Sequence, residues 1–270
     1  MVEQGCIYTA RTRAPLLQGL TMAAQKVALV TGASRNIGRS ISLALARRGY
    51  TLACFGRDAA ALDETASMIH ALGGQASVFV GDAKSNSSLQ DFAAHAVQAH
   101  GGIDAVINNA GVVVERRPED ITPEEFAETL QVNLVSQFAL ARAAYAPLRA
   151  RGGGVIINIG SLAGAMAFPR TAAYCASKAG IDGLTRALAY DWASDDIRVL
   201  CVAPGYVKSD ISKDVLADER KRDWVLRRIP LRRVAEPEEI ANFVAFLASD
   251  AASFCTGETY YVDGGQRMAI

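Results

Sequence analysis

Two residues in the second half of the chain have types and a spacing suited to proton transfer. Tyr174 and Lys178 are four positions apart, so on a helix they lie on one face, one turn from each other. A tyrosine with its ordinary pKa of about 10 is a weak base near neutrality, but an adjacent ammonium group lowers that pKa. The pair therefore predicts a catalytic acid/base. Because an ordinary helix with a buried ring and a surface lysine has the same spacing, further residues must decide.

A glycine-rich turn near the start of the chain predicts a phosphate site. Residues 31–38, Thr-Gly-Ala-Ser-Arg-Asn-Ile-Gly, follow a short apolar run and lead into a helix predicted from Ile37. Free backbone N–H groups and the positive end of a helix dipole favour phosphate at such a place. Glycine is needed where the backbone turns sharply or approaches a ligand closely. Any tight strand-to-helix connection favours glycine, however, so the turn alone does not establish nucleotide binding.

The end of the next apolar run indicates which nucleotide the turn would hold. In folds that bind NAD, an acidic residue near this point holds the ribose 2′-hydroxyl, whereas a cation accommodates the 2′-phosphate of NADP. This run ends in Phe55-Gly56-Arg57, without an acid. Arg57 and Arg35 could together bind the extra phosphate through bidentate hydrogen bonds. The residues favour NADP over NAD, although two solvated surface arginines would look the same.

Short apolar runs alternate with longer helical stretches, and this alternation would position the residues named above. The runs cover residues 26–30, 51–55, 76–80, 103–107, 154–159 and 197–202, and helices are predicted from Ile37, Ala59 and about Ser85. Continuous apolar runs are typical of strands buried on both faces, and strand-helix alternation predicts a parallel sheet covered by helices. With right-handed crossovers, the result is a single-domain, Rossmann-type, doubly wound α/β fold.

We expect one catalytic, dinucleotide-binding domain over residues 24–270. The polar, helix-forming segment at residues 208–233 follows a strand end, so it is expected to lie over the carboxyl edge of the sheet as a substrate lid. Residues 1–23 are interpreted as a flexible tail, or as an over-long gene assignment in which Met22 is the natural start. A transit peptide is disfavoured.

The bulk composition excludes several classes of partner. Lysine plus arginine and aspartate plus glutamate number 28 each, so no overall field favours nucleic acid or an anionic membrane. No apolar run approaches the roughly 20 residues that a membrane span needs. The five cysteines are scattered and odd in number, which favours reduced thiols in the cytoplasm. We interpret His70, His95 and His100 as surface residues and expect no metal site.

The motifs, taken together and in order, resemble those of the short-chain dehydrogenase/reductase family over about residues 24–265. The matching features are the turn at residues 31–38, Asn108-Asn109-Ala110-Gly111, a serine thirteen positions before Tyr174, Pro204-Gly205, and Val262-Asp263-Gly264-Gly265. The resemblance implies an oxidoreductase that moves a hydride between NADP(H) and a carbonyl or secondary alcohol.

The resemblance also implies roles for four catalytic residues. Tyr174 would give its proton to the carbonyl oxygen in the reductive direction, while Lys178 lowers the pKa of Tyr174 and bonds the nicotinamide ribose. Ser161 would stabilise the negative charge that develops on the substrate oxygen. Asn133 matches the family asparagine that steadies a water chain relaying protons to Lys178.

A larger set is expected to bind the cofactor. By the same resemblance, Asp82 would bond the adenine amino group, Asn109 to Gly111 would line the adenosine ribose pocket, and Ser209 would contact the nicotinamide carboxamide. The full expected set is Gly32, Ser34, Arg35, Asn36, Ile37, Gly38, Arg57, Asp82, Ala83, Asn109, Ala110, Gly111, Tyr174, Lys178, Pro204, Gly205, Val207 and Ser209.

One departure from the family pattern concerns the cofactor turn. The family usually has glycine where this chain has Asn36. Asparagine is the residue other than glycine that best tolerates a left-handed backbone, so we expect the turn to survive. The side chain could still crowd or bond the cofactor.

A second departure concerns the substrate. Family reductases that act on acyl carrier protein present arginines at positions that look like Ala139 and Tyr190 here, and the second neighbourhood is acidic through Asp191, Asp195 and Asp196. This pattern favours a small carbonyl or polyol substrate over a carrier-bound one. Three lid arginines could serve the carrier instead, namely Arg222, Arg227 and Arg228.

Three functional hypotheses therefore remain: a reductase or dehydrogenase of a small substrate, a 3-oxoacyl thioester reductase, and a nucleotide-binding sensor or scaffold without turnover. Proteins of the last kind usually lose the tyrosine or the lysine, and this chain retains both. Family members commonly form tetramers through the helices that follow the fourth and fifth strands and through the C-terminal strand. We therefore expect a homotetramer.

Overall fold

The computed structural model of the chain describes residues 25–210 and 212–269. The predicted tail at residues 1–23 lies outside them. In chain order the strands are β1 (Val27–Thr31), β2 (Thr51–Gly56), β3 (Ala76–Val80), β4 (Ala105–Asn108), β5 (Gly154–Ile159), β6 (Ile197–Pro204) and β7 (Thr259–Val262). They form one sheet in the order β3-β2-β1-β4-β5-β6-β7, and every neighbouring pair is parallel. The predicted doubly wound parallel sheet is confirmed.

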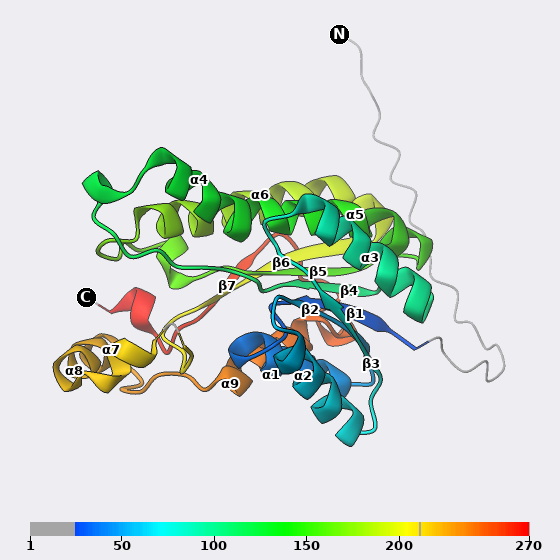
Figure 1. Cartoon of the computed structure of the whole chain (residues 1–270), viewed down its shortest axis with the longest axis horizontal. Helices are drawn as coiled ribbons and strands as arrows, with labels where there is room; N and C mark the ends of the chain where they lie inside the picture. The colour runs from blue at the N-terminus through cyan, green and yellow to red at the C-terminus, as the bar shows by residue number, and fades with distance from the viewer. Residues whose placement is uncertain (1–24, 211, 270) are drawn as a thin grey trace, which may run out of the picture.

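Helices cover both faces of this sheet. They are α1 (Asn36–Ala46), α2 (Ala59–Ala71), α3 (Asn86–His100), α4 (Pro123–Leu130), α5 (Ser136–Ala150), α6 (Ala172–Trp192), α7 (Lys213–Ala217), α8 (Glu219–Arg228) and α9 (Pro237–Leu247). Figure 1 shows α3, α5 and α6 on one face and α1, α2 and α9 on the other. Within the described part of the chain, none of these helices has both the length and the apolar character to cross a membrane.

The sheet separates two apolar cores, which explains the unbroken apolar runs of its strands. Alternate residues of β1 point to opposite sides, so Ala28 and Val30 pack against α1 and α9 while Val27 and Leu29 pack against α3 and α5. Strands β1, β2 and β4 are buried throughout, whereas the edge strands β3 and β7 are partly exposed. Burial on both faces selects apolar residues at every position.

The connections reverse direction between β1 and β4, and ligands bind at such a switch point in open α/β sheets. From β1 the chain proceeds outward through β2 to β3, then returns to place β4 on the other side of β1. The carboxyl ends of these strands therefore border one crevice. Helices α7 and α8 project from the body beyond the end of β6 (Figure 1).

Two details differ from the sequence-based expectation. Helix α1 begins one residue earlier than predicted, at Asn36. The interpretation of all three histidines as surface residues is wrong for two of them. His95 is half-buried against the ring of Phe79, and His100 is half-buried with its Nε2 atom 2.8 Å from the Ser77 hydroxyl. Both lie on α3, on the side that packs toward β3.

Candidate active site

A cavity of about 1440 Å³ lies at the carboxyl ends of the central strands. It brings together the loops after β1, β2, β3, β4, β5 and β6 with the start of α6 and the segment carrying α7 and α8. The predicted site residues that line it are Gly32, Ser34, Arg35, Asn36, Ile37, Gly38, Arg57, Asp82, Ala83, Asn109, Ala110, Gly111, Ser161, Tyr174, Lys178, Pro204, Gly205, Val207 and Ser209. Asn133 is the one predicted site residue that does not line it.

The turn after β1 has the geometry of a phosphate cradle. Gly32 has φ +65°, and a Cβ atom at Gly38 would lie 2.0 Å from the Gly32 carbonyl oxygen, so a side chain cannot fit there. Helix α1 starts without a side-chain cap and without an acid in its first turn, whereas α2 and α3 are capped by Asp58 and Ser85. The first N–H groups of α1 therefore remain available to an anion.

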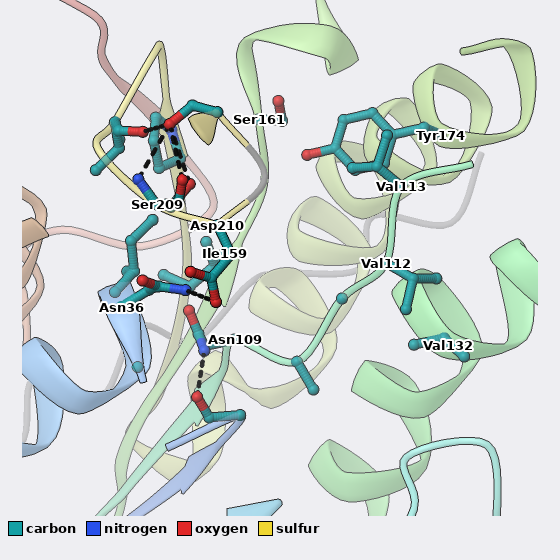
Figure 2. Close-up of a pocket in the computed structure, with 18 of the residues that line it drawn as sticks. Asn36, Asn109, Val112, Val113, Val132, Ile159, Ser161, Tyr174, Ser209 and Asp210 are labelled. Carbon is teal, nitrogen blue, oxygen red and sulfur yellow. Dashed lines mark hydrogen bonds between the residues drawn. The ribbon is translucent and has the colours of Figure 1, made fainter. Parts of the chain in front are cut away.

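Asn36 adopts the left-handed backbone that its residue type tolerates, with φ 48°. Its amide Nδ2 donates a hydrogen bond of 3.1 Å to Asp210, and the Arg35 guanidinium lies 3.1 Å from the same carboxylate. Figure 2 shows the hydrogen bond between Asn36 and Asp210. Arg57 lines the cavity with no side-chain partner among the described residues. Of the two arginines predicted to bind the 2′-phosphate, Arg35 is thus paired with Asp210, and Arg57 has no side-chain partner among the described residues.

The loop after β4 is held against the end of β1. The Thr31 hydroxyl oxygen accepts hydrogen bonds from the backbone N–H groups of Asn109 (2.9 Å) and Ala110 (3.0 Å). The Asn109 side chain donates in return to the Thr31 carbonyl at 2.9 Å. These bonds fix residues 109–111 over the switch point, where they form one wall of the cavity. Thr31 was not singled out by the sequence analysis beyond its place in the glycine turn.

Ser161 and Tyr174 present their hydroxyl groups to the same space (Figure 2). Ser161 follows β5, and Tyr174 lies in the first turn of α6. The Ser161 hydroxyl oxygen accepts a hydrogen bond from the N–H of Ala163 at 3.1 Å, which leaves its proton available as a donor. Burial raises the pKa of the Tyr174 phenol, and the interaction with Ser161 opposes this in part. The phenol is therefore protonated at neutral pH and able to act as an acid.

Lys178 is buried behind Tyr174. Its Nζ atom donates a hydrogen bond of 2.7 Å to the Ile159 carbonyl and lies 5.6 Å from the centre of the Tyr174 ring. Burial lowers the pKa of Lys178 to about 8. Burial shifts the pKa of Tyr174 upward, which is opposite to the lowering that we expected from Lys178.

Asn133 lies in a π-helical turn, Gln131–Val135, that joins α4 to α5. Its Nδ2 atom donates to the Val112 carbonyl (2.9 Å) and to the Ser177 hydroxyl (3.0 Å), and its Oδ1 atom accepts from the Val112 N–H (2.8 Å). The residue is fully buried. These bonds position the loop after β4 relative to α6.

Residues after β3 and β6 complete the cavity. Asp82 lines the wall near the end of β3, where its carboxylate accepts a hydrogen bond from the Lys84 N–H at 2.9 Å. Ser209 and Val207 lie at the root of the lid, and the Ser212 hydroxyl bonds the Val207 carbonyl at 2.6 Å. The Ser212 hydroxyl oxygen also accepts from the Ser209 N–H at 3.0 Å. This small network fixes how the lid leaves β6.

Comparison with known proteins decides the family. The family model described as enoyl-(acyl carrier protein) reductase matches residues 32–267. A 3-oxoacyl-[acyl-carrier-protein] reductase of Pseudomonas aeruginosa is 38% identical over 90% of this chain and 98% of its own, and one from Staphylococcus epidermidis is 37% identical over 90% and 99%.

The chain belongs to the short-chain dehydrogenase/reductase family.

Solved structures of this family agree with the fold. A proposed short-chain alcohol dehydrogenase from Sinorhizobium meliloti superimposes with a TM-score of 0.89 at 35% identity, covering 92% of this chain and 98% of that one. A proposed NAD(P)-dependent gluconate 5-dehydrogenase from Beutenbergia cavernae, solved with NADP bound at low occupancy, gives 0.87 at 35% identity, covering 91% and 98%. The predicted resemblance is confirmed, and with it the oxidoreductase class.

Several residues that line the cavity were not among those predicted from the sequence. Asp210 was missed because its partners, Arg35 and Asn36, are some 175 positions away and no local pattern links them. Arg170 and Arg220 also line the cavity. Arg170 precedes the predicted catalytic helix directly, and that position was the one available signal.

Proposed function

We propose that this enzyme transfers a hydride between NADP(H) and a small carbonyl compound or secondary alcohol, with Tyr174 as the acid/base. The observation that carries the proposal is the arrangement of Tyr174, Ser161 and Lys178 around one cavity whose other end holds an uncapped helix N-terminus. The family relatives include both reductases and dehydrogenases, and one was solved with NADP.

The residues present fit a dinucleotide phosphate. The free N–H groups at the start of α1 would hold the pyrophosphate, and the unpaired Arg57, with Arg35, would hold the 2′-phosphate. We assign Asp82 to the adenine, Asn109 to Gly111 to its ribose, and Lys178 to the nicotinamide ribose. Backbone and side-chain groups from Pro204 to Ser209 would contact the carboxamide. We further propose that residues 208–233 act as a lid over the substrate.

In the reductive direction, NADPH held by these residues would supply the hydride that reduces the carbonyl carbon. The Tyr174 hydroxyl donates its proton to the carbonyl oxygen as the C=O electron pair moves onto that oxygen, so one C–H and one O–H bond form. Ser161 donates a hydrogen bond to the same oxygen and stabilises its growing charge. Lys178 supplies positive charge behind the phenol and favours loss of its proton. Asn133 holds the loop and helix that carry these groups in register.

The decisive experiment measures NADPH and NADH binding by the purified protein, followed by turnover of a panel of ketones, aldehydes and secondary alcohols. We expect tighter NADPH binding, loss of that preference in Arg57→Ala, and loss of turnover in Tyr174→Phe with nucleotide affinity retained. Tight NADPH binding without turnover of any panel member would favour the sensor or scaffold hypothesis instead.

A second candidate is the reduction of 3-oxoacyl thioesters. The observation that favours it is the 37–38% identity to 3-oxoacyl-[acyl-carrier-protein] reductases. Of the acids that argued against a carrier protein, Asp195 is bound by Arg149 (3.0 Å) and by the Tyr145 hydroxyl (2.6 Å). Its charge is therefore largely neutralised locally. Rapid turnover of acetoacetyl thioesters, beyond that of simple ketones, would identify this activity.

We also propose a cytoplasmic homotetramer. Support comes from apolar side chains left exposed on α5 and α6, including Phe138 and the 88% exposed Tyr190, and from Phe254 next to β7. The described cysteines Cys54, Cys175, Cys201 and Cys255 are unpaired, in keeping with a reducing compartment. Light scattering at micromolar concentration tests the tetramer, and a monomeric mass would refute it.

A further inference from the structure

Three cations that line the cavity come from the loop before α6 and from the lid. Arg170 lies in the loop between Ser161 and α6, and Arg220 and Lys221 lie in the first turn of α8 on the lid. Glu115 also lines the cavity, and the Lys221 ammonium lies 3.9 Å from the Asp218 carboxylate. Among the described residues, Arg170 and Arg220 are therefore the two of these three cations without a side-chain partner, although the chain as a whole is neutral.

Arg170 is held in a backbone conformation that its residue type seldom adopts. Its φ is 63°, in the left-handed region, and its carbonyl oxygen accepts a hydrogen bond of 2.8 Å from the Arg116 N–H. Its guanidinium has no partner among the described residues, whereas neighbouring Arg116 pairs with Glu125 at 2.9 Å. Strain of this kind persists where the surrounding structure imposes it, and it is concentrated at functional sites.

The arginines of the lid likewise divide into some whose guanidinium groups have partners and one whose guanidinium has none. Arg227 and Arg228 bond backbone carbonyls of their own helix, and Arg228 stacks on Trp224 at 3.7 Å. Arg220 has no side-chain partner in the described part of the chain. The Asp218 carboxylate caps the first turn of α8 by accepting from the N–H groups of Arg220 (3.0 Å) and Lys221 (3.1 Å). The turn is thus fixed by its backbone while the Arg220 guanidinium stays free.

Aromatic walls surround these cations. The ring of Phe168 meets that of Tyr206 edge-on at 6.3 Å, and Trp224 lines the cavity beside them. Burial raises the pKa of Tyr206, the charge of Glu115 acts in the same direction, and Arg228 opposes it. Apolar walls lower the local dielectric and strengthen the attraction between a fixed cation and a bound anion.

We propose that Arg170 and Arg220 bind a carboxylate of the substrate, so that the enzyme acts on oxo acids and their hydroxy acid products rather than on neutral carbonyls. The charge of Lys221 is partly offset by Asp218 at 3.9 Å, and Glu115 reduces the attraction. A guanidinium suits a carboxylate because its planar donors can form two parallel hydrogen bonds. The inference rests on the proposed hydride transfer and narrows its substrate class.

The test compares 2-, 3-, 4- and 5-oxo acids with their methyl esters in NADPH-dependent reduction. We expect kcat/KM for the preferred acid to exceed that of its ester by about tenfold or more, since a charge-assisted pair is lost in the ester. In Arg170→Gln and in Arg220→Gln, KM should rise for the acid and stay nearly constant for the ester. In Glu115→Gln, KM for the acid should fall, because a negative charge is removed from the cavity lining.

Arg48→Gln is the matched control, because it removes one exposed positive charge at the far end of α1. It should leave the acid-to-ester ratio unchanged, and circular dichroism of each variant checks that it folds. Equal kcat/KM for acids and esters, or an acid preference that survives in both cavity variants, would overturn the inference. Such a result leaves the proposed function intact if turnover still depends on Tyr174. Absence of NADPH binding or of any Tyr174-dependent turnover would instead refute the proposed function itself.

Discussion

A single lysine illustrates how the fold adjusts a functional group before any ligand arrives. Lys178 is 4% exposed and has one hydrogen-bond acceptor, the Ile159 carbonyl, at 2.7 Å. Burial disfavours the charged ammonium, and this brings its pKa from 10.5 to about 8. The thiol of Cys201 stays neutral over this range because burial raises its pKa to about 12. Near neutral pH the folded protein therefore carries a buried positive charge on Lys178, which its surroundings stabilise less well than water would.

The stability of the protein should reflect this charge. Between pH 8 and pH 10.5 the unfolded chain still holds the Lys178 proton that the folded chain has lost, so the free energy of unfolding should rise with pH across this range. At pH 7, Lys178→Met should stabilise the protein by about 2 kcal/mol, after allowance for the lost hydrogen bond. Calorimetric unfolding of both proteins at pH 7 and pH 10 measures the effect, and a destabilised variant at pH 7 would contradict it.

At the scale of elements, the lid root and the phosphate turn share one carboxylate. Asp210 lies 3.1 Å from both Arg35 and Asn36, at the N-terminus of α1 where we place the cofactor phosphates. An anionic cofactor must displace or accommodate this carboxylate. The contact thus competes with the cofactor for Arg35.

Removing the competitor should tighten NADPH binding. Both partners are more than half exposed, so the pair contributes little, and Asp210→Ala should lower the dissociation constant for NADPH about two- to fivefold. Asp214→Ala removes a similar exposed charge from α7 without touching Arg35, and it should change the constant less. Fluorescence titration at low ionic strength measures both. Weaker binding in Asp210→Ala would show that the carboxylate helps to hold the cofactor rather than opposing it.

The sequence predicts the regular elements well and the irregular ones poorly, for a physical reason. Strand β1 and helix α1 follow from local apolar runs and a glycine turn, which the chain encodes within a few residues. The π-helical turn around Asn133 depends on bonds to Val112 and Ser177, which lie in other parts of the chain. The left-handed backbone of Arg170 likewise depends on Arg116. Irregular backbone conformations of this kind arise from contacts between distant parts of the chain, so no local sequence pattern predicts them.

At the scale of the whole molecule, α5 and α6 each leave an aromatic side chain exposed. Phe138 on α5 is 44% exposed and Tyr190 on α6 is 88% exposed. Both helices cover the same face of the sheet, and we interpret their exposed rings as part of a surface that another protein covers. A second copy of this chain is the partner that the proposed homotetramer provides.

An acidic substitution should therefore break the assembly. In Phe138→Asp, a charge would be buried between copies without a partner, so the tetramer should dissociate at micromolar concentration. Light scattering coupled to gel filtration measures the mass. Arg48→Asp, at an exposed position just after α1 on the other face of the sheet, tests whether any added charge has this effect. An unchanged mass in Phe138→Asp would exclude α5 from the interface.

The Asp210 contact also bears on the order in which two ligands arrive. Asp210 lies at the start of the segment that carries Arg220, so an incoming phosphate that releases Arg35 removes one contact between this segment and α1, while the Ser212 network still holds the lid root. A substrate carboxylate would then meet an adjusted lid only after the nucleotide has bound. Steady-state kinetics should accordingly follow a compulsory sequence, with NADP⁺ a competitive inhibitor against NADPH and the alcohol product non-competitive against it. In the Asp210→Ala variant that sequence should relax toward random addition.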